Sequence, residues 1–498
     1  MKIEGRRYRD EWIPNYFPSR AVGGHRIRVS RTGKLIAMTP EEDEQLEKIF
    51  MAQELYERLE RTGHIVTARN SADVLADLKT WFSLTYAGPM LHIVVATKRC
   101  NLDCVYCHML PEAVGADPSR FDLQPDTAEA IVRFIAGTPN ECNMIEFQGG
   151  EPFLNFEGIR HTVETAKRVN AEVGKRLDFT IVSNLMVAKD EQLAYCAEND
   201  IHISYSLNGP PDIHDRYRLT RSGVGSFHKV VRRIAEIQAR FPGLISTSPL
   251  CVIAQESPEE VVRTIDFFHE AGFDSVALLK LRHLGKVRTA GLKYEFRDFM
   301  RSYIAGLDHI LEKNRRGGRV YAERMVRVVL AKLLSDSDVG YVDWRNPIGD
   351  VSCVLTYDHD GEILPSDEAR SLREEFTLGN VRDTTWQDLM ERESTFRTMN
   401  LSLRDRDPTC RECPYNPYCG VAPILDFART GDASPRPHES EECLFTIGLL
   451  DWAIARYLED PVALLKMLPD ADTFLSSLLA EAQSLAAGGP AGADRGAA

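Results

Sequence analysis

The chain has 498 residues, too many for one ordinary hydrophobic core, and we expect two to four domains. Its content of 43% apolar and 27% charged residues is typical of a globular protein in water, and its net charge of −14 argues against a nucleic-acid binder, because no basic excess is available to neutralise phosphates. No apolar run approaches the ~20 residues that cross a bilayer, and the N-terminus lacks an apolar signal segment, so we expect a cytoplasmic protein without membrane contact.

The first predicted elements form a small N-terminal unit over residues 1–89. Residues 25–29 and 34–38 alternate with period two around a turn that ends in Gly33, which predicts a hairpin. Thr39 then opens a helix, and further helical stretches follow at 53–61 and 72–82. A hairpin with three helices suggests a winged-helix-like module, and an ordinary capping domain is the alternative.

The region from 90 to 290 alternates strand-like apolar runs with amphipathic helices. The predicted strands are 91–96, 144–147, 179–182, 202–206, 246–253 and 275–280. Repeated strand–helix units predict an α/β fold with a parallel sheet, either open or curled into a barrel, whose carboxyl edge carries the active site. The rest of the chain is divided into a helical linker region (291–345), a cysteine-containing region (346–450), and terminal helices with a disordered tail (451–498).

Seven of the eleven cysteines fall in two tight groups, which in a reducing compartment indicates metal or cluster ligation. Cys100, Cys104 and Cys107 follow the first predicted strand with C-x3-C-x2-C spacing. Three thiolates can hold three irons of a [4Fe–4S] cubane and leave the fourth iron open to a cofactor. A structural zinc site with His108 as fourth ligand is the alternative, although zinc usually takes C-x2-C pairs.

With this loop the chain resembles the radical S-adenosylmethionine (SAM) superfamily. The sequence FQGGEP at 147–152 matches the GGEP motif, which in that family binds the methionine amino group of SAM. The resemblance implies a partial (β/α)6 TIM-like barrel, a [4Fe–4S] cluster on the three cysteines, and SAM as a second cofactor. The residues it assigns to SAM are Tyr106, Gln148, Gly149, Gly150, Glu151, Pro152, Ser183, Asn184, Ser206 and Asn208. Serine and asparagine at the last four positions also end strands for turn reasons alone.

The second cysteine group consists of Cys410, Cys413, Cys419 and Cys443. Its spacing by itself suits either a zinc ribbon or an iron–sulfur cluster. The segment resembles the SPASM domain, a C-terminal extension of peptide-modifying radical SAM enzymes that typically holds two auxiliary clusters. Ser366 and Pro423 stand here at two of its cysteine positions. The resemblance therefore implies one auxiliary [4Fe–4S] cluster on the four cysteines, and two clusters in total.

Two further polar segments have both a catalytic and a structural interpretation. Asp367 directly follows Ser366, and in related sulfatase-maturing enzymes an aspartate at the matching position is the catalytic base. The alternative is that residues 366–368 only begin a helix at 369–375, with Ser366 as its N-cap. His214 and Asp215, in the segment PPDIHDRYR, either line a peptide channel or begin a capped helix.

Several stretches, among them SDEAR at 366–370 and LGNV at 378–381, resemble the His-Xaa-Ser system radical SAM maturases and related cyclophane-forming enzymes. This resemblance implies an oxidoreductase that modifies or crosslinks side chains of a ribosomally synthesised precursor peptide, whose leader adds as a strand to the N-terminal module. It also implies a flavodoxin or ferredoxin as electron donor. The alternatives are a radical SAM dehydrogenase, a sulfatase-maturase-like enzyme and, from another class, a non-catalytic zinc-binding adaptor.

Overall fold

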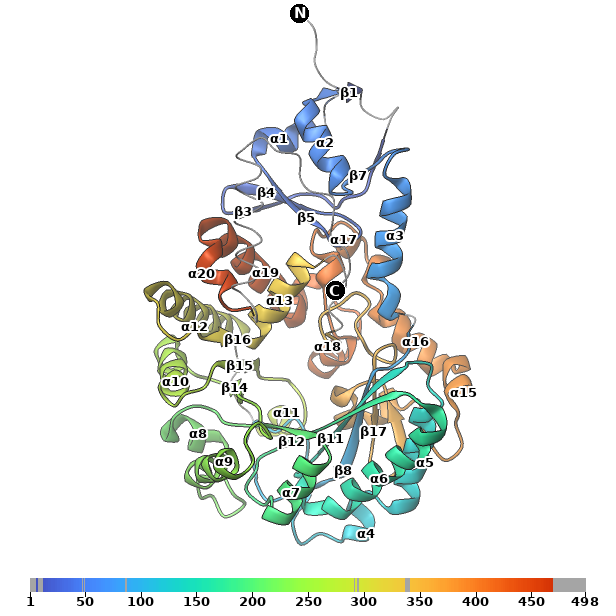
Figure 1. Cartoon of the computed structure of the whole chain (residues 1–498), viewed down its shortest axis with the longest axis vertical. Helices are drawn as coiled ribbons and strands as arrows, with labels where there is room; N and C mark the ends of the chain where they lie inside the picture. Colours follow the sequence, from blue (N-terminus) through green and yellow to red (C-terminus); the bar gives the residue numbers. More distant parts are fainter. Residues whose placement is uncertain are drawn as a thin grey trace, which may run out of the picture.

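The computed structural model of the chain describes residues 6–7, 12–46, 48, 50–85, 87–290, 292, 295–335 and 341–468. The N-terminal unit lies at one end of the long axis and the α/β region at the other, with C-terminal helices between them (Figure 1). No helix among the described residues is long and apolar enough to cross a membrane. The predicted disordered tail lies outside these residues.

The N-terminal unit is built on a three-stranded antiparallel sheet that contains the predicted hairpin. Thr39 begins the first helix with a capping box, because its hydroxyl accepts from the backbone N–H of Glu42 while the Glu42 carboxylate accepts from the N–H of Thr39. Apolar side chains of the sheet and the second helix enclose a small separate core around Leu55 and Leu59. The elements are β3 (Arg20–Val22), β4 (His25–Val29), β5 (Leu35–Met38), α1 (Pro40–Gln45), α2 (Gln53–Arg61) and α3 (Ser71–Trp81).

The α/β region is a parallel sheet that curls into a partial, unclosed barrel, which confirms the predicted fold class. Its first sheet contains β13 (Ile201–Tyr205), β12 (Arg176–Ser183), β11 (Cys142–Gly149) and β8 (Leu91–Thr97) in that spatial order. An isolated bridge from Ser206 to Leu250 continues the curve to a second sheet of β14 (Leu250–Ile253), β15 (Ser275–Lys280) and β16 (Ala322–Glu323). The outer face is covered by α5 (Pro125–Ala136), α6 (Phe156–Val173), α7 (Asp190–Glu198), α9 (Phe227–Arg240) and α10 (Pro258–Glu270) (Figure 1).

Two predicted elements differ from the structure. The strand predicted at 246–253 begins only at Leu250, because the Ser246 hydroxyl accepts from the N–H of Ser248 (3.0 Å) and Pro249 has no N–H for a ladder. The helix predicted at 369–375 is replaced by a 3-10 turn at Asp367–Ser371 and a short α14 (Arg373–Phe376), and the Ser366 hydroxyl makes no capping bond.

A strand from the C-terminal region extends the barrel sheet. β17 (Val354–Tyr357) pairs in parallel with β8, and β18 (Glu362–Leu364) and β19 (Gly379–Asn380) follow it at the sheet edge. The fully buried His92 holds this pairing, because its ring bonds to the Tyr357 hydroxyl (2.9 Å) and to the amide oxygen of Asn143 (3.1 Å). The sheet therefore runs across the predicted boundary at residue 346.

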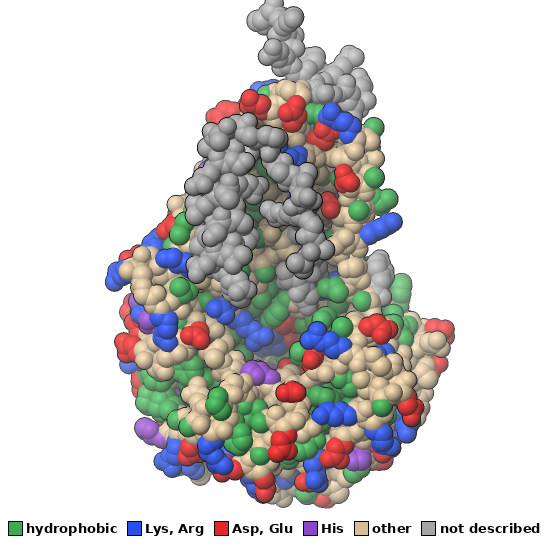
Figure 2. Space-filling model, in the orientation of Figure 1, with side chains coloured by type: hydrophobic (Ala, Val, Ile, Leu, Met, Phe, Trp, Pro, Cys, Tyr) green, Lys and Arg blue, Asp and Glu red, His purple; other side chains and the backbone are tan. Residues whose placement is uncertain are grey.

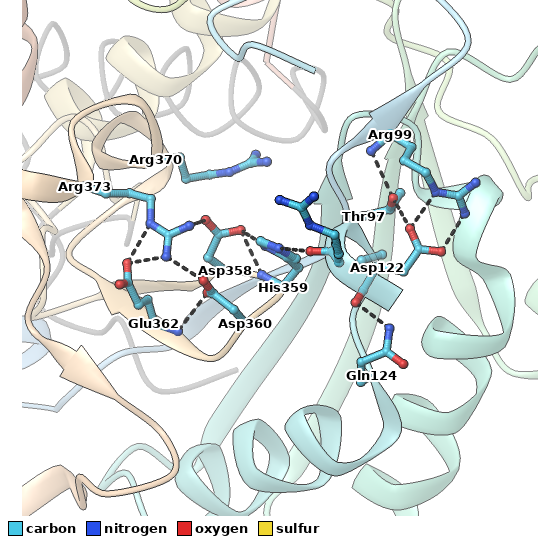
Figure 3. A network of polar contacts seen from close by, with 12 residues as sticks. Thr97, Arg99, Asp122, Gln124, Asp358, His359, Asp360, Glu362, Arg370 and Arg373 are labelled. Atoms are coloured by element: carbon cyan, nitrogen blue, oxygen red, sulfur yellow. Dashed lines mark hydrogen bonds and ion pairs between the residues drawn. The ribbon is translucent and has the colours of Figure 1, made fainter. Parts of the chain in front are cut away.

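An ion-pair network fixes the turn between β17 and β18 (Figure 3). The guanidinium of Arg373 contacts the carboxylates of Asp358 (2.8 Å) and Asp360 (2.7 Å). The ring of His359 bonds to the carbonyl oxygen of Arg120 (3.0 Å), which ties the turn to the barrel region. Asp358, His359 and Asp360 are grouped closely enough for a cation, but Arg373 already supplies the positive charge that this group needs.

The N-terminal unit rests on the cysteine-rich segment of the C-terminal region. Arg20 on β3 makes two bonds to Asp451 on α19 (Glu441–Glu459), at 2.7 and 2.6 Å. The Tyr418 hydroxyl donates to the carbonyl of Gly33 (2.5 Å), and the Tyr418 ring meets Trp81 edge-on. A Cβ at Gly33 would lie 2.3 Å from Trp81, so this hairpin turn requires glycine.

The remaining helices are α4 (Pro118–Phe121), α8 (Pro211–Tyr217), α11 (Lys286–Ala290), α12 (Phe296–Arg316), α13 (Arg324–Leu334), α15 (Trp386–Glu391), α16 (Glu393–Ser402), α17 (Pro408–Arg411), α18 (Pro423–Thr430) and α20 (Pro461–Leu465). The remaining strands form three short pairs, which are β1 (Arg6–Arg7) with β6 (Phe50–Met51), β2 (Ile13–Pro14) with β7 (Ile65–Val66), and β9 (Arg99–Cys100) with β10 (Glu112–Ala113). Helices α12, α13, α19 and α20 lie between the barrel and the N-terminal sheet (Figure 1).

Candidate active site

A cavity of about 350 Å³ lies at the carboxyl ends of the barrel strands. Loops that follow β8, β11, β12 and β13 line it, as do side chains from 341–350 and 420–445. Figure 2 shows the molecule hollowed near its middle, with basic and hydrophobic side chains in the hollow. The predicted site residues that line the cavity are Cys100, Cys104, Tyr106, Cys107, Gln148, Gly149, Gly150, Ser183, Asn184 and Ser206.

Two glycines of the GGEP sequence bring the end of β11 against the strand that leads into the cysteine loop. A Cβ at Gly149 would lie 2.2 Å from the carbonyl oxygen of Thr97, and one at Gly150 would lie 2.3 Å from that of Arg99. The N–H of Gly150 donates to the Thr97 carbonyl (2.7 Å). Glycine at both positions therefore lets the two backbones meet, and both are then presented to the cavity.

Glu151 and Pro152 of the same sequence lie behind the cavity wall and do not line it. The fully buried Glu151 carboxylate accepts from the Ser183 hydroxyl (2.7 Å) and from the N–H of Asn184 (2.8 Å). These bonds join the end of β11 to the end of β12. Glu151 thus holds Ser183 and Asn184 at the cavity, and the structure does not bring its own carboxylate there.

Tyr106 is held in place by two buried side chains. Its hydroxyl donates to the amide oxygen of Asn208 (3.2 Å) and accepts from Nη1 of Arg218 (3.0 Å). Asn208 is fully buried and does not line the cavity. Arg218 does line it, is 7% exposed, and lies near the thiols of Cys104 and Cys100. Sequence reasoning missed Arg218, although the segment PPDIHDRYR ends on it.

His214 and Asp215 of that segment do not line the cavity. The buried His214 ring bonds to the Ser226 hydroxyl (2.9 Å) and accepts from the N–H of Asn208 (3.2 Å), and burial lowers the pKa of His214 to about 3. The carboxylate of Asp215 accepts from the N–H of Phe227 (2.9 Å), at the start of α9. Both side chains are used at the start of α9, and the peptide-channel interpretation stays a prediction.

The two cysteine groups differ in their access to the cavity. Cys100, Cys104 and Cys107 line it, so these three thiols would hold a cluster at the cavity. The other group does not line it, and consists of Cys410, Cys413, Cys419 and Cys443. Burial raises the pKa of Cys100 and of Cys443 to about 12, and neighbouring thiols of the same group add to each rise. Thiols that raise one another's pKa in this way are easier to ionise with a bound cation, and three or four cysteine thiolates are the donor sets that iron–sulfur clusters use.

Asp367 lies beside the cavity and reaches it through a neighbour. Its carboxylate bonds to Nε2 of His108 (3.0 Å) and accepts from Nη1 of Arg370 (3.0 Å), and of the three only His108 lines the cavity. Burial alone would raise the pKa of Asp367, but the charges and hydrogen bonds of His108 and Arg370 outweigh burial and hold that pKa well below its ordinary value. A carboxylate in this state is a weak proton acceptor.

The cavity is also lined by charged side chains that sequence reasoning missed. Lys280 is ion-paired with Glu442, and Arg282 with Glu368. Asp343 and Asp350 line the cavity as well. They lie between α13 and β17, where the described residues form no helix or strand, and the sequence there has no recognisable motif that marks them.

Residues 94–275 match the Radical SAM superfamily. The chain is 22% identical over 343 residues to the cysteine-type anaerobic sulfatase-maturating enzyme of Clostridium perfringens, which covers 66% of this chain and 88% of that enzyme. It is 23% identical over 362 residues to the serine-type anaerobic sulfatase-maturating enzyme of Bacteroides thetaiotaomicron, with coverage of 68% and 83%.

Solved structures share the fold. Native anSMEcpe with bound AdoMet and Cp18Cys peptide has a TM-score of 0.61 at 20% identity, covering 75% of this chain and 99% of that chain. Streptococcus suis SuiB bound to precursor peptide SuiA has a TM-score of 0.50 at 14% identity, covering 84% and 97%. The matched residues 94–275 contain the cysteine loop, the GGEP glycines and five of the strands whose ends line the cavity, so this part of the chain carries a radical SAM domain.

Proposed function

We propose that this chain is a radical SAM maturase that oxidises or crosslinks side chains of a ribosomally synthesised precursor peptide. The observation that carries the proposal is the cavity, which is lined by three thiols and the GGEP glycines together with charged side chains of the C-terminal region. A radical formed near the thiols would then be in the same cavity as a substrate held by these charged side chains. The peptide-bound relatives support a peptide as that substrate.

In this proposal the three cysteines hold the cluster, and other residues around them bind SAM. Cys100, Cys104 and Cys107 hold a [4Fe–4S] cluster, and when bound, this cluster and SAM supply a 5′-deoxyadenosyl radical that takes hydrogen from an unactivated carbon. The open backbone at 148–150 and the buried cation of Arg218 are placed to bind the amino and carboxylate ends of SAM.

The second cysteine group would hold an auxiliary [4Fe–4S] cluster, which makes two clusters in total. Its four thiols come from α17, the loop after it and α19, away from the cavity, which suits electron transfer and leaves the substrate to the first cluster. A flavodoxin or ferredoxin would supply electrons. Asp367, which contacts His108 and Arg370, would act as a positioning residue for this side of the cavity.

The N-terminal unit offers a strand edge for the leader of such a peptide. Within the described part of the chain, β5 pairs only with β4. The Val29 carbonyl faces away from β5, because it accepts from the N–H of Phe17 (2.9 Å). Val29 is paired with Leu35, and in an antiparallel pair both partners then point their backbone groups away from each other, so those of Leu35 point toward the open edge of β5. The alternation repeats every two residues, so the N–H and C=O of Ala37 point the same way. An added peptide strand would pair with these groups.

Co-expression with short open reading frames from its own operon tests the proposed function. A modified precursor should lose ~2 Da for each oxidative bond formed, and tandem mass spectrometry should show no cleavage between two crosslinked residues. If the precursors are recovered with unmodified mass, although the purified chain holds iron and cleaves SAM, the result would argue for a substrate other than a peptide.

An Ala37→Pro variant should raise KM for the full precursor about 3- to 10-fold, because proline removes one outward N–H from the strand edge without breaking a bond of the hairpin. Steady-state kinetics on full precursor and on the same peptide without its leader measure this. The leaderless peptide is the control and should be processed equally by both proteins. An unchanged KM for the full precursor would place leader binding elsewhere.

A further inference from the structure

The charged side chains that line the cavity from Lys280 onward in the chain are more often negative than positive. Glu442 and Glu368 are compensated by Lys280 and Arg282, as described above. Asp343 and Asp350 line the same cavity, and neither is ion-paired to a described side chain. Asp350 is 5% exposed, and its Oδ2 is buried with no hydrogen-bond partner among the described residues.

Two carboxyl groups in this position are costly to ionise without a neighbouring cation. Burial raises the pKa of Asp343 to about 6, and Glu368 and Glu442 add to the rise, while the charges of Arg282 and Arg324 oppose it without reversing it. Burial also raises the pKa of Asp350 well above its ordinary value. A cation that arrives between the two would offset this cost and let both ionise.

Some of the groups around Asp350 raise its pKa and others lower it. Glu368 and Asp343 raise its pKa in addition to burial, whereas Arg282 and the Ser366 hydroxyl oppose the rise. Arg282 is already committed to Glu368, so it does not neutralise Asp350 as well. Asp343 and Asp350 therefore lack a compensating cation among the described residues, whereas Glu442 and Glu368, which also line the cavity, each have one.

We propose that Asp343 and Asp350 form a subsite for a cationic side chain of the substrate, the guanidinium of an arginine or the ammonium of a lysine. This inference rests on the proposed function for its peptide, and it adds the class of residue that the peptide places beside the thiols. The subsite is rigid on one side, because a Cβ at Gly420 would lie 1.9 Å from the carbonyl oxygen of Asp343. A preformed site of this kind binds with little ordering cost.

The test compares two probes of nearly the same shape, N-acetyl-arginine methylamide and N-acetyl-citrulline methylamide, which differ in charge. Both are titrated by calorimetry into the full-length, iron-loaded chain with saturating SAM present, so that the SAM site is already filled and only the remaining cavity is probed. Near neutral pH the arginine compound should bind at least about 10-fold more tightly, because each bond to a charged partner is strong. Equal dissociation constants, or tighter binding of citrulline, would overturn the subsite.

The pH dependence and one pair of variants identify the groups involved. Arginine-compound binding should weaken as pH falls through about 6, where Asp343 becomes protonated, and citrulline-compound binding should not change. Asp350→Asn should reduce the arginine preference to near unity. Asp360→Asn, which changes a carboxylate that contacts Arg373 outside the cavity, should keep it. A preference retained in Asp350→Asn would contradict the assignment of this carboxylate.

Formation of 5′-deoxyadenosine, measured in the same samples after reduction, tests the proposed function separately. If it forms while the two probes bind equally, the radical function stands and the cationic subsite is wrong. If it does not form, the radical function is wrong, and the probe comparison on the wild-type chain still decides whether the cavity binds cations. Iron content and circular dichroism of each variant show that it is folded.

Discussion

A Cys104→Ala variant will lose reductive cleavage of SAM and keep about half of the iron of the wild-type chain. Cys104 lines the cavity together with Cys100 and Cys107, whereas the four C-terminal cysteines lie outside it. Two cubanes hold about eight irons, so the loss of one site should leave about four. Iron analysis of anaerobically reconstituted protein and chromatography of 5′-deoxyadenosine measure the two effects.

Cys142→Ala is the matched control for this experiment, since Cys142 is exposed at the start of β11 and far along the chain from either group. It should keep the full iron content and the full yield of 5′-deoxyadenosine. Zinc in place of iron in the wild-type chain would contradict the cluster assignment and favour a non-catalytic adaptor. An iron content that is unchanged in Cys104→Ala would show that the iron is not bound by Cys104 at the cavity.

Asp367→Asn should lower the free energy of unfolding by ~3 kcal/mol, because it leaves the buried guanidinium of Arg370 without its carboxylate. The Arg370 side chain is only 4% exposed, so water cannot replace the lost partner. The double variant Asp367→Asn/Arg370→Met removes the buried charge as well and should recover most of the stability. Denaturant titration of the three proteins measures this.

Turnover of the double variant then separates the two roles of Asp367. We expect turnover to return toward the wild-type value, because the low pKa of Asp367 makes it a weak base and a positioning role explains its contacts. A double variant that is stable yet inactive would instead assign proton transfer to Asp367, as in the sulfatase-maturing enzymes that the sequence resembles. Asp360→Asn is the control, because this half-exposed carboxylate shares Arg373 with Asp358 and should contribute less than ~1 kcal/mol.

Local sequence patterns predict most of the barrel, because strand period, helix amphipathicity and turn chemistry act over a few residues. The strand at Ser275–Lys280 was predicted at its observed bounds, and the N-terminal hairpin is present as predicted. β17 was not predicted as a strand of the barrel. Its pairing with β8 joins residues such as His92 and Tyr357 that lie 265 positions apart, and four residues carry no distinctive period.

The sequence by itself determined the kind of chemistry. The spacing of Cys100, Cys104 and Cys107 and the glycines at 149–150 depend on neighbours along the chain, so they were recognisable before folding was considered. The expectation of a second cluster on Cys410, Cys413, Cys419 and Cys443 likewise came from spacing and resemblance alone.

Only the tertiary structure decided which side chains face the cavity. It brought in Arg218, Asp343 and Asp350, and it placed Glu151 and Asp367 behind the wall. The physical reason is that the position of a polar side chain depends on hydrogen-bond partners that other segments of the chain supply. The partners that hold Glu151 come from the end of the next strand, and His108, which bonds to Asp367, lies 259 residues earlier in the chain. The local sequence therefore could not predict that either carboxylate lies behind the cavity lining.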